Sequence, residues 1–286
     1  MIRNNPNQNK ENGLIGLVTT PIGNIDDITL RALRFLKEAD IIACEDTRNT
    51  GLLLSRLNIK PKKLVSLYAQ TEKKQSKELV EEVKKGKLTL AYCSDAGMPG
   101  ISDPGALLVQ QAYEQGVAVT ILPGPTASLS ALVLSGIDSA DFSFYGFLPT
   151  KDSQEKTFLS RLKDREETLI FYESPKRIKK TLSLMEGIFG EYREVSLIRE
   201  LTKIHEEVIH GTLKEINSTS IEEKGECVIA VKGETKKESL SEEEVKKLLK
   251  SGLKEGKTLS ALAKEIASSY PISKNEVYRI GLEMKK

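Results

Sequence analysis

The stretch Y-C-S-D-A-G-M-P-G-I-S-D-P-G, from Tyr92 to Gly105, decides how the rest of the chain is interpreted. The apolar run 88–93 leads into it and is typical of a buried strand. Residues 106–115 follow it with apolar side chains at close to helical spacing. The three glycines and two prolines between these elements exclude regular structure. A loop of about twelve residues at the carboxyl end of a strand in an α/β sheet predicts a ligand-binding role.

The segment 14–135 repeats one pattern, in which an apolar strand is followed by a polar loop and an amphipathic helix. Alternating strands and helices predict a parallel sheet with right-handed crossovers. The first helix is expected at 28–38, capped by Asp26 or Asp27. The strands of this half are expected at 14–19, 41–44, 64–67, 88–93 and 117–122, with 88–93 in the centre.

A second pattern begins after the small-residue connector 135–141. Its strands are expected at 142–147, 168–172, 194–199, 206–211 and 227–231, with helices at 156–162 and 176–189. The last three strands are closely spaced, which predicts antiparallel pairing and a mixed sheet. Charged and amphipathic segments after residue 236 predict a small helical appendage, with helices at 259–269 and 274–283.

These patterns predict an α/β protein with two α/β domains and a helical appendage. The expected divisions are a flexible tail (1–12), an N-terminal α/β domain (13–124), a second α/β domain (125–235) and the C-terminal appendage (236–286). With 39% apolar and 29% charged residues, the composition is that of a globular protein. No apolar run approaches the roughly 18 residues of a membrane span, and the polar tail does not resemble a signal peptide. We expect no membrane association and a cytoplasmic location.

The cysteines and histidines do not predict a metal site. Cys44, Cys93 and Cys227 match no metal-binding spacing and are expected to be buried free thiols in a reducing compartment. His205 and His210 are five residues apart in a predicted strand, so they are expected to face opposite sides. We therefore predict no bound metal.

Four loops at predicted strand ends are rich in residues with special chemistry, namely 19–24, 45–49, 94–105 and 123–127. The carboxyl ends of parallel strands share one edge of a sheet, so these loops are expected to line a single cleft. None of them is a G-x-G-x-x-G dinucleotide loop or a G-K-[ST] phosphate loop. The cleft is therefore expected to bind another kind of ligand.

With these loops in view, the chain resembles the tetrapyrrole methylase family. The matching stretches run in family order from residue 20 to residue 207: TPIGNIDDITLRA (20–32), CEDTRNT (44–50), SDAGMPGISDPG (94–105), PGPTA (123–127), YGFLP (145–149), FYESPKR (171–177) and RELTKIHEE (199–207). The motifs EDTR, SPKR and RELTK, with SDAG in place of a G-D-P loop, are similar to the branch that methylates RNA. Lys176 departs from that branch, which usually has histidine there.

The resemblance implies S-adenosylmethionine as cofactor, bound in a cleft between two unequal α/β domains. It also implies a homodimer and methyl transfer to the ribose 2'-hydroxyl of a cytidine in 16S ribosomal RNA of the small subunit. Asp95 is the only carboxylate directly at the strand end, so it is a candidate acceptor for a cofactor hydroxyl or ammonium. The cofactor-binding residues expected from this reasoning and the resemblance are Pro21, Asp95, Met98, Ile101, Thr126, Ala127, Tyr172 and Leu201. Capping of the turn backbone is the alternative role for Asp95 and Asp103.

Methyl transfer from a sulfonium is an in-line displacement, so an enzyme mainly has to align the reacting atoms. A ribose hydroxyl is a very weak acid, and a general base or a nearby cation helps to remove its proton. Glu200 and Lys203, together with Asp46 and Arg48, are the catalytic candidates, because each motif offers both a carboxylate and a cation. The alternative is that both pairs are structural ion pairs that hold their loops.

Cations beside a sulfonium would repel it, so basic residues are expected on the RNA side of the site. Lys176, Arg177 and Arg199 are candidate phosphate contacts. The net charge of the chain is +2, but residues 236–286 carry 12 basic and 8 acidic side chains. This surplus makes the terminal helices either an RNA-docking element or a cover for an apolar edge.

Three functions remain open from the sequence. The first is the RNA 2'-O-methyltransferase. The second keeps the fold and acts on a tetrapyrrole or a protein side chain, although a small substrate gives the basic appendage no purpose. The third is a non-catalytic RNA-binding assembly factor, which the intact SDAGMPGISDPG and RELTK loops disfavour.

Overall fold

The computed structural model describes residues 4–6, 10–68, 71–234, 240–270 and 272–284. The chain divides into two compact units, Met1–Gly233 and Glu234–Lys286. Parts of the predicted tail, 1–3 and 7–9, and the start of the predicted appendage, 236–239, lie outside the described residues. Within the tail, the Asn4 side chain donates to the Val119 carbonyl (2.7 Å) and accepts from its N–H (3.1 Å), so the chain is tied to the first sheet at this point.

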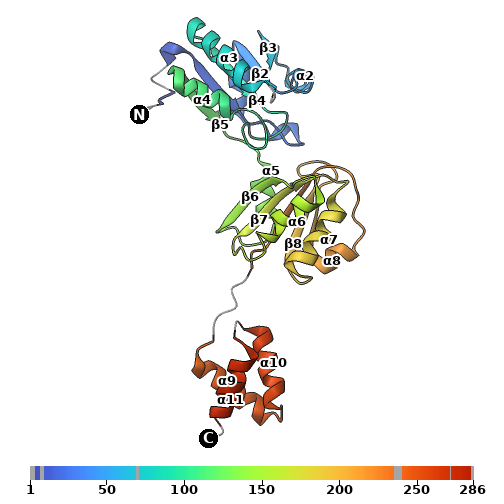
Figure 1. The fold of residues 1–286 in the computed structure, drawn as a ribbon. Coiled ribbons are helices and arrows are strands. Elements are labelled where there is room, and N and C mark those ends of the chain that lie inside the picture. Colours follow the sequence, from blue (N-terminus) through green and yellow to red (C-terminus); the bar gives the residue numbers. More distant parts are fainter. Residues whose placement is uncertain (1–3, 7–9, 69–70, 235–239, 271, 285–286) are drawn as a thin grey trace. The chain divides into compact units, whose positions relative to one another are not determined.

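The first half of the larger unit is built on a five-stranded sheet in the order β3-β2-β4-β1-β5 (Figure 1). Every pairing in this sheet is parallel, and β4 lies in the centre, as the sequence predicts. The strands are β1 (Leu14–Val18), β2 (Ile41–Cys44), β3 (Leu64–Ser66), β4 (Thr89–Cys93) and β5 (Ala118–Leu122). Burial on both faces explains why these strands are almost continuously apolar.

Helices cover both faces of this sheet. On one face, α3 (Glu72–Gly86) and α4 (Ala106–Gln115) pack on side chains such as Ile15, Leu90 and Tyr92. On the other, α1 (Leu30–Glu38) and α2 (Thr47–Arg56) pack on alternate side chains such as Ala91 and Cys93. The alternation along β4 follows from the two-residue period of a strand.

The start of α1 differs from the prediction. The helix begins at Leu30 and not at 28, and its cap is Thr29, whose hydroxyl accepts from the Ala32 N–H (3.1 Å). Asp26 and Asp27 instead lie in the short 3-10 turn η2 (Ile25–Asp27), which Asn24 caps. Two acidic residues before an apolar run resemble a helix cap in sequence, but the additional turn moves the cap to Thr29.

The second half of the larger unit has a mixed sheet in the order β6-β7-β10-β8-β9. The pair β6–β7 is parallel, whereas β10 pairs antiparallel with β7 and β8, and β8 with β9; this confirms the predicted antiparallel pairing. The strands are β6 (Phe142–Phe147), β7 (Thr168–Glu173), β8 (Glu194–Arg199), β9 (Glu207–Thr212) and β10 (Cys227–Val231). His205 precedes β9, so only His210 of the two histidines lies in the strand.

Four helices enclose this mixed sheet. One face carries α6 (Asp152–Ser160), α7 (Ile178–Phe189) and α8 (Leu213–Ser218), and the opposite face carries α5 (Ala127–Ser135). The helix α8 was not predicted, although the sequence T-L-K-E (212–215) is typical of a capping box. In the structure, the Thr212 hydroxyl accepts from the Glu215 N–H, and the Glu215 carboxylate accepts from the Thr212 N–H.

The described residues of the smaller unit form three helices, α9 (Glu242–Lys254), α10 (Leu259–Ser269) and α11 (Lys274–Glu283). They enclose their own apolar core, to which each helix contributes, for example through Leu249, Leu262 and Val277. No helix among the described residues has both the length and the apolar character needed to cross a membrane. All three cysteines are buried free thiols, as predicted.

Candidate functional site

The loops that follow β1 and β4 are joined at the carboxyl edge of the first sheet. The Thr20 N–H donates to the Gly97 carbonyl (2.9 Å), and the Gly97 N–H donates to the Thr20 carbonyl (3.1 Å). Gly97 has φ +80°, a conformation that favours glycine. The same loop is held at its other end by the Glu72 carboxylate, which accepts from the Gly105 N–H (2.7 Å). The long loop is therefore fixed at both ends.

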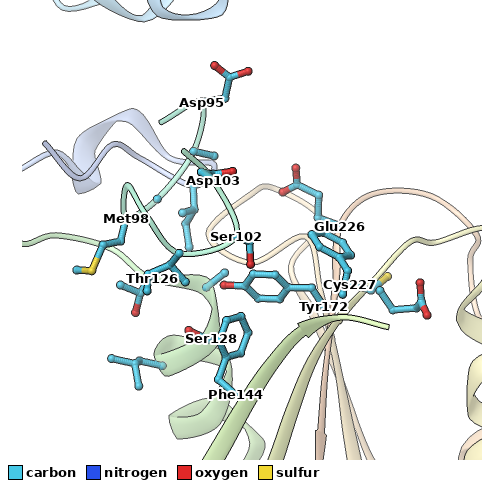
Figure 2. Close-up of a pocket in the computed structure, with 18 of the residues that line it drawn as sticks. Asp95, Met98, Ser102, Asp103, Thr126, Ser128, Phe144, Tyr172, Glu226 and Cys227 are labelled. Atoms are coloured by element: carbon cyan, nitrogen blue, oxygen red, sulfur yellow. The ribbon is translucent and has the colours of Figure 1, made fainter. Parts of the chain in front are cut away.

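A cavity of about 560 Å³ opens beside this loop, within the usual range for small-molecule sites. It is lined by Ile22 of the loop after β1, residues 95–98 and 101–103 of the long loop, the first turn of α5, parts of β6 and β7, and the segment before β10 (Figure 2). The cavity thus joins the carboxyl edge of the parallel sheet to the mixed sheet of the same unit.

Every charged side chain that lines the cavity is acidic: Asp95, Asp103, Glu173 and Glu226. Burial, with smaller contributions from the charges of Glu45 and Asp95, raises the pKa of Asp103 to about 6. Glu173 is almost fully buried and contacts Arg177, whereas Glu226 is exposed. Such a lining attracts a positively charged ligand.

An aromatic wall lies opposite the long loop. Tyr172 contacts Phe144 and Phe147 edge to face, with ring centroids 4.8 and 5.5 Å apart. Burial raises the pKa of Tyr172 even though hydrogen bonds with Ser128 act in the opposite direction. Figure 2 shows the Tyr172 ring beside Ser102 of the long loop. The wall offers flat apolar surface to a ring or a sulfonium.

Asp95 is tied to the loop after β2. Its carboxylate accepts from the Asp46 N–H (3.2 Å) and from the Asn49 side-chain amide (2.8 Å), and Figure 2 shows it at the far edge of the group. Asp46 itself caps α2 by accepting from the Arg48 N–H (2.8 Å), and it pairs with the exposed Arg48 guanidinium (2.7 Å). The predicted loop 45–49 therefore positions the cavity edge but does not line the cavity. The other three predicted loops each contribute residues to the cavity lining.

The Glu200–Lys203 segment is a strained turn next to the cavity. Glu200 and Thr202 have φ +50° and +65°, a region that non-glycine residues rarely adopt. The Glu200 carboxylate accepts from Lys203 Nζ (2.9 Å) and from the Glu226 N–H (2.8 Å). Lys203 also pairs with the Glu226 carboxylate (3.1 Å). These two bonds to Glu200 hold the turn together, whereas Glu226 is the carboxylate that lines the cavity.

The ionisation of this group follows from these contacts. Burial alone would lower the pKa of Lys203, but hydrogen bonds with Glu200 and Glu226 outweigh burial and raise it. The hydrogen bond from Lys203 is the main reason that the pKa of Glu200 is lowered. Lys203 is therefore a cation and not a proton acceptor at neutral pH.

Two of the three predicted phosphate contacts have structural partners instead. Arg177 lies 3.1 Å from the buried Glu155 carboxylate and donates to the Pro149 carbonyl (2.9 Å). The side chain of Arg199 is only 6% exposed, and it pairs with Glu207. The sequence shows that both arginines belong to charged motifs, but it does not show which carboxylates they pair with in the fold. Lys176 is exposed.

Of the eight predicted cofactor residues, six line the cavity: Asp95, Met98, Ile101, Thr126, Ala127 and Tyr172. Pro21 and Leu201 do not line it; Leu201 packs in the core beside Ile22. Four further lining residues were not predicted from the sequence, namely Phe144, Phe147, Glu173 and Glu226. The YGFLP stretch contained a signal for Phe147, whereas nothing in the sequence around Glu226 distinguishes it from neighbouring surface glutamates.

Comparisons with known proteins agree on one family. Residues 15–217 match the sequence model of the tetrapyrrole (corrin/porphyrin) methylases. The chain is 41% identical over 275 residues to "Ribosomal RNA small subunit methyltransferase I" of Streptococcus pyogenes serotype M1, covering 94% of this chain and 95% of that one. It is 40% identical over 280 residues to the protein of the same name from Bacillus subtilis (strain 168), covering 95% of each chain.

Solved structures show the same fold at much lower identity. The methyltransferase CobJ matches with a TM-score of 0.58 at 17% identity, covering 80% of this chain and 97% of that chain. A uroporphyrin-III-C-methyltransferase from Thermus thermophilus matches with a TM-score of 0.52 at 18% identity, covering 77% of this chain and 92% of that chain. About a fifth of this chain therefore has no counterpart in these two structures.

Proposed function

Because the chain belongs to the tetrapyrrole (corrin/porphyrin) methylase family, we propose that it transfers a methyl group from S-adenosylmethionine to the ribose 2'-hydroxyl of a cytidine in 16S ribosomal RNA. The relatives named for small-subunit ribosomal RNA methylation support the RNA substrate, since they match nearly the whole chain. The choice of a cytidine 2'-hydroxyl rests on the resemblance of the EDTR, SPKR and RELTK motifs to that branch of the family.

The acidic cavity is the observation that carries this proposal. S-adenosylmethionine has two positive groups, a sulfonium and an ammonium, and the carboxylates of Asp95 and Asp103 in the cavity lining suit such a ligand. The aromatic wall of Phe144, Phe147 and Tyr172 suits a flat adenine. The residues of this chain therefore fit the cofactor, which supplies an electrophilic methyl group when bound.

Lys203 and Glu226 are the residues that we assign to the methyl acceptor. The ion pair holds a carboxylate at the cavity and a cation beside it (3.1 Å). Glu226 accepts a hydrogen bond from the ribose hydroxyl, orients its oxygen and takes up its proton as the oxygen is methylated, while the Lys203 charge favours loss of that proton. Glu200 fixes the position of Lys203 and, because it does not line the cavity, is a positioning residue.

The remaining candidates have indirect roles in this proposal. Asp46 and Arg48 position the loop that holds Asp95, so we assign them to the shape of the cavity edge and not to chemistry. Asp95 retains acceptor capacity for the cofactor, because a carboxylate can accept about four hydrogen bonds and two are made here. Lys176 is retained as a phosphate contact because it is exposed.

A homodimer in the cytoplasm completes the proposal. On α5, Leu129 and Val133 are four residues apart, so they share one face of the helix, and they are 48% and 76% exposed. A second copy of the chain that packs on this face would remove this apolar pair from water, which favours association. Sedimentation of the purified chain tests this part of the proposal.

The function is tested by offering several acceptors in parallel. Purified protein is incubated with cofactor that carries a labelled methyl group and with small ribosomal subunits, naked 16S ribosomal RNA or a tetrapyrrole precursor. We expect label on ribosomal RNA. Label only on the tetrapyrrole would contradict the RNA substrate, and cofactor binding without any transfer would favour a non-catalytic assembly factor.

A further inference from the structure

The C-terminal unit, Glu234–Lys286, contributes no residue to the lining of the cavity described above. It lies beyond the residues that match the family model, which end at 217. The ribosomal RNA methyltransferase relatives match 94–95% of the chain, so their alignments must include most of this unit. A segment shared with these relatives and absent from the family model is a candidate for a function linked to the substrate.

One face of α9 carries three exposed lysines. Val245 and Leu249 bury the opposite face in the core of the unit. Lys247, Lys250 and Lys254 follow one another at intervals of three and four residues, so they share one side of the helix over about 10 Å. We refer to these three residues as the α9 lysine face.

The lysines of this face differ from their neighbours in their pairing. Lys246 pairs with Glu242, and Lys257 pairs with Glu265. Within the part of the chain that the structure describes, the α9 lysine face forms no ion pair. The acidic residues of α9 are confined to its first turn, which leaves the last two turns of this side positive.

An open groove of about 480 Å³ adjoins the face, lined by Lys250, Leu253, Lys254 and Met284. Its lining therefore combines two ammonium groups with a leucine and a methionine side chain. Ammonium groups bind phosphates as mobile point charges, and soft apolar side chains accept the face of a sugar or base. This combination fits a nucleotide strand, in which phosphates alternate with sugars and bases.

We propose that the α9 lysine face binds the sugar–phosphate backbone of the RNA substrate. This inference rests on the proposed function, since it assigns a second contact surface to the same substrate. Phosphate contacts position a nucleic acid without reading its sequence, so the expected contribution is to affinity for RNA and not to the choice of nucleotide.

The test compares two triple variants of the full chain. The first replaces Lys247, Lys250 and Lys254 with glutamine. The matched control replaces Lys257, Lys264 and Lys274, which lie outside α9 on the same unit and remove the same charge. Affinity for 16S ribosomal RNA is measured from about 50 to 200 mM salt, together with cofactor affinity and with kcat and KM for methyl transfer.

In the first variant, we expect the affinity for RNA to fall at least about tenfold at low salt. The slope of the logarithm of the RNA association constant against the logarithm of the salt concentration should flatten by about 2, as expected when three single-strand phosphate contacts are lost. KM for RNA should rise, while kcat and cofactor affinity stay unchanged. Wild-type RNA affinity in the first variant would overturn the inference, and so would an equal loss in both variants. Failure of the wild-type protein to methylate any RNA would instead contradict the proposed function.

Discussion

Single residues account for the shape of the turn beside the cavity. Gly225 has φ +82°, and a Cβ at this position would lie 2.3 Å from Oε1 of Glu200. Glu200, in turn, is held in a left-handed conformation by its bonds to Lys203 and to the Glu226 N–H. The position of the Lys203–Glu226 pair therefore depends on a residue that has no side chain.

The change Gly225→Ala should reduce methyl transfer at least tenfold and lower the free energy of unfolding by about 1–3 kcal/mol, because the methyl group displaces Glu200 and the backbone is strained. Gly116→Ala is the matched control, since Gly116 also has positive φ (+70°) but nothing lies near its Cβ position. Chemical denaturation and single-turnover rates measure both effects. Equal behaviour of the two variants would show that the contact with Glu200 is unimportant.

Asp103 gives the cavity a dependence on pH. Because burial raises its pKa to about 6, this carboxyl gains its negative charge as the pH rises through about 6. A cationic ligand is attracted only by the ionised form, so affinity for S-adenosylmethionine should increase severalfold between pH 5 and pH 7. Calorimetric titration at several pH values measures the change.

Asp103→Asn should bind the cofactor more weakly at pH 7 and lose most of this pH dependence. Asp164→Asn, an exposed position outside the cavity lining, makes the same charge change and should retain the wild-type profile. A pH profile in Asp103→Asn that matches the wild type would remove Asp103 from the binding site.

At the scale of elements, the sequence predicts strands well and side-chain partners poorly. The strands of the first sheet are predictable because burial on both faces makes them continuously apolar. The glycine-rich loop that directly follows β4 predicts the edge of the cavity. The partners of Arg177 depend on how the start of α7 packs on α6 and β7, and those of Arg199 depend on the strands beside β8. That information is carried by strand order, which local sequence patterns do not contain.

Arg177 provides the test at this scale. Its guanidinium faces the buried carboxylates of Glu155 and Glu173, so Arg177→Met should lower the free energy of unfolding by about 3–5 kcal/mol by leaving buried charge uncompensated. Lys180→Met breaks an exposed pair with Asp152 and should change the free energy of unfolding by less than about 1 kcal/mol. Wild-type stability in Arg177→Met would contradict the structural role and return Arg177 to the list of phosphate contacts.

At the scale of the whole molecule, the residues of the proposed reaction and the C-terminal helices belong to two different folded units. The cavity and the Lys203–Glu226 pair belong to Met1–Gly233, whereas Glu234–Lys286 has a core of its own. Damage to one core should therefore leave the other unit folded.

Leu249→Ala tests this independence. Leu249 is fully buried in the core of the smaller unit, so its truncation should destabilise that unit by about 2–5 kcal/mol. Hydrogen exchange should become faster in α9, α10 and α11 and stay slow in both sheets, with cofactor affinity unchanged. Loss of cofactor binding in this variant would contradict the separation.

The most direct test of the central claim identifies the atom that receives the methyl group. Small-subunit RNA labelled by the purified protein is divided into two samples. One sample is digested to nucleosides, and the labelled nucleoside is identified by mass. The other sample is treated with alkali, which does not cleave the phosphodiester bond next to a 2'-O-methyl group. We predict a single labelled product, 2'-O-methylcytidine, formed by the wild-type protein and strongly reduced in Lys203→Ala. A methyl group on a base, on a protein or only on a tetrapyrrole would contradict the account.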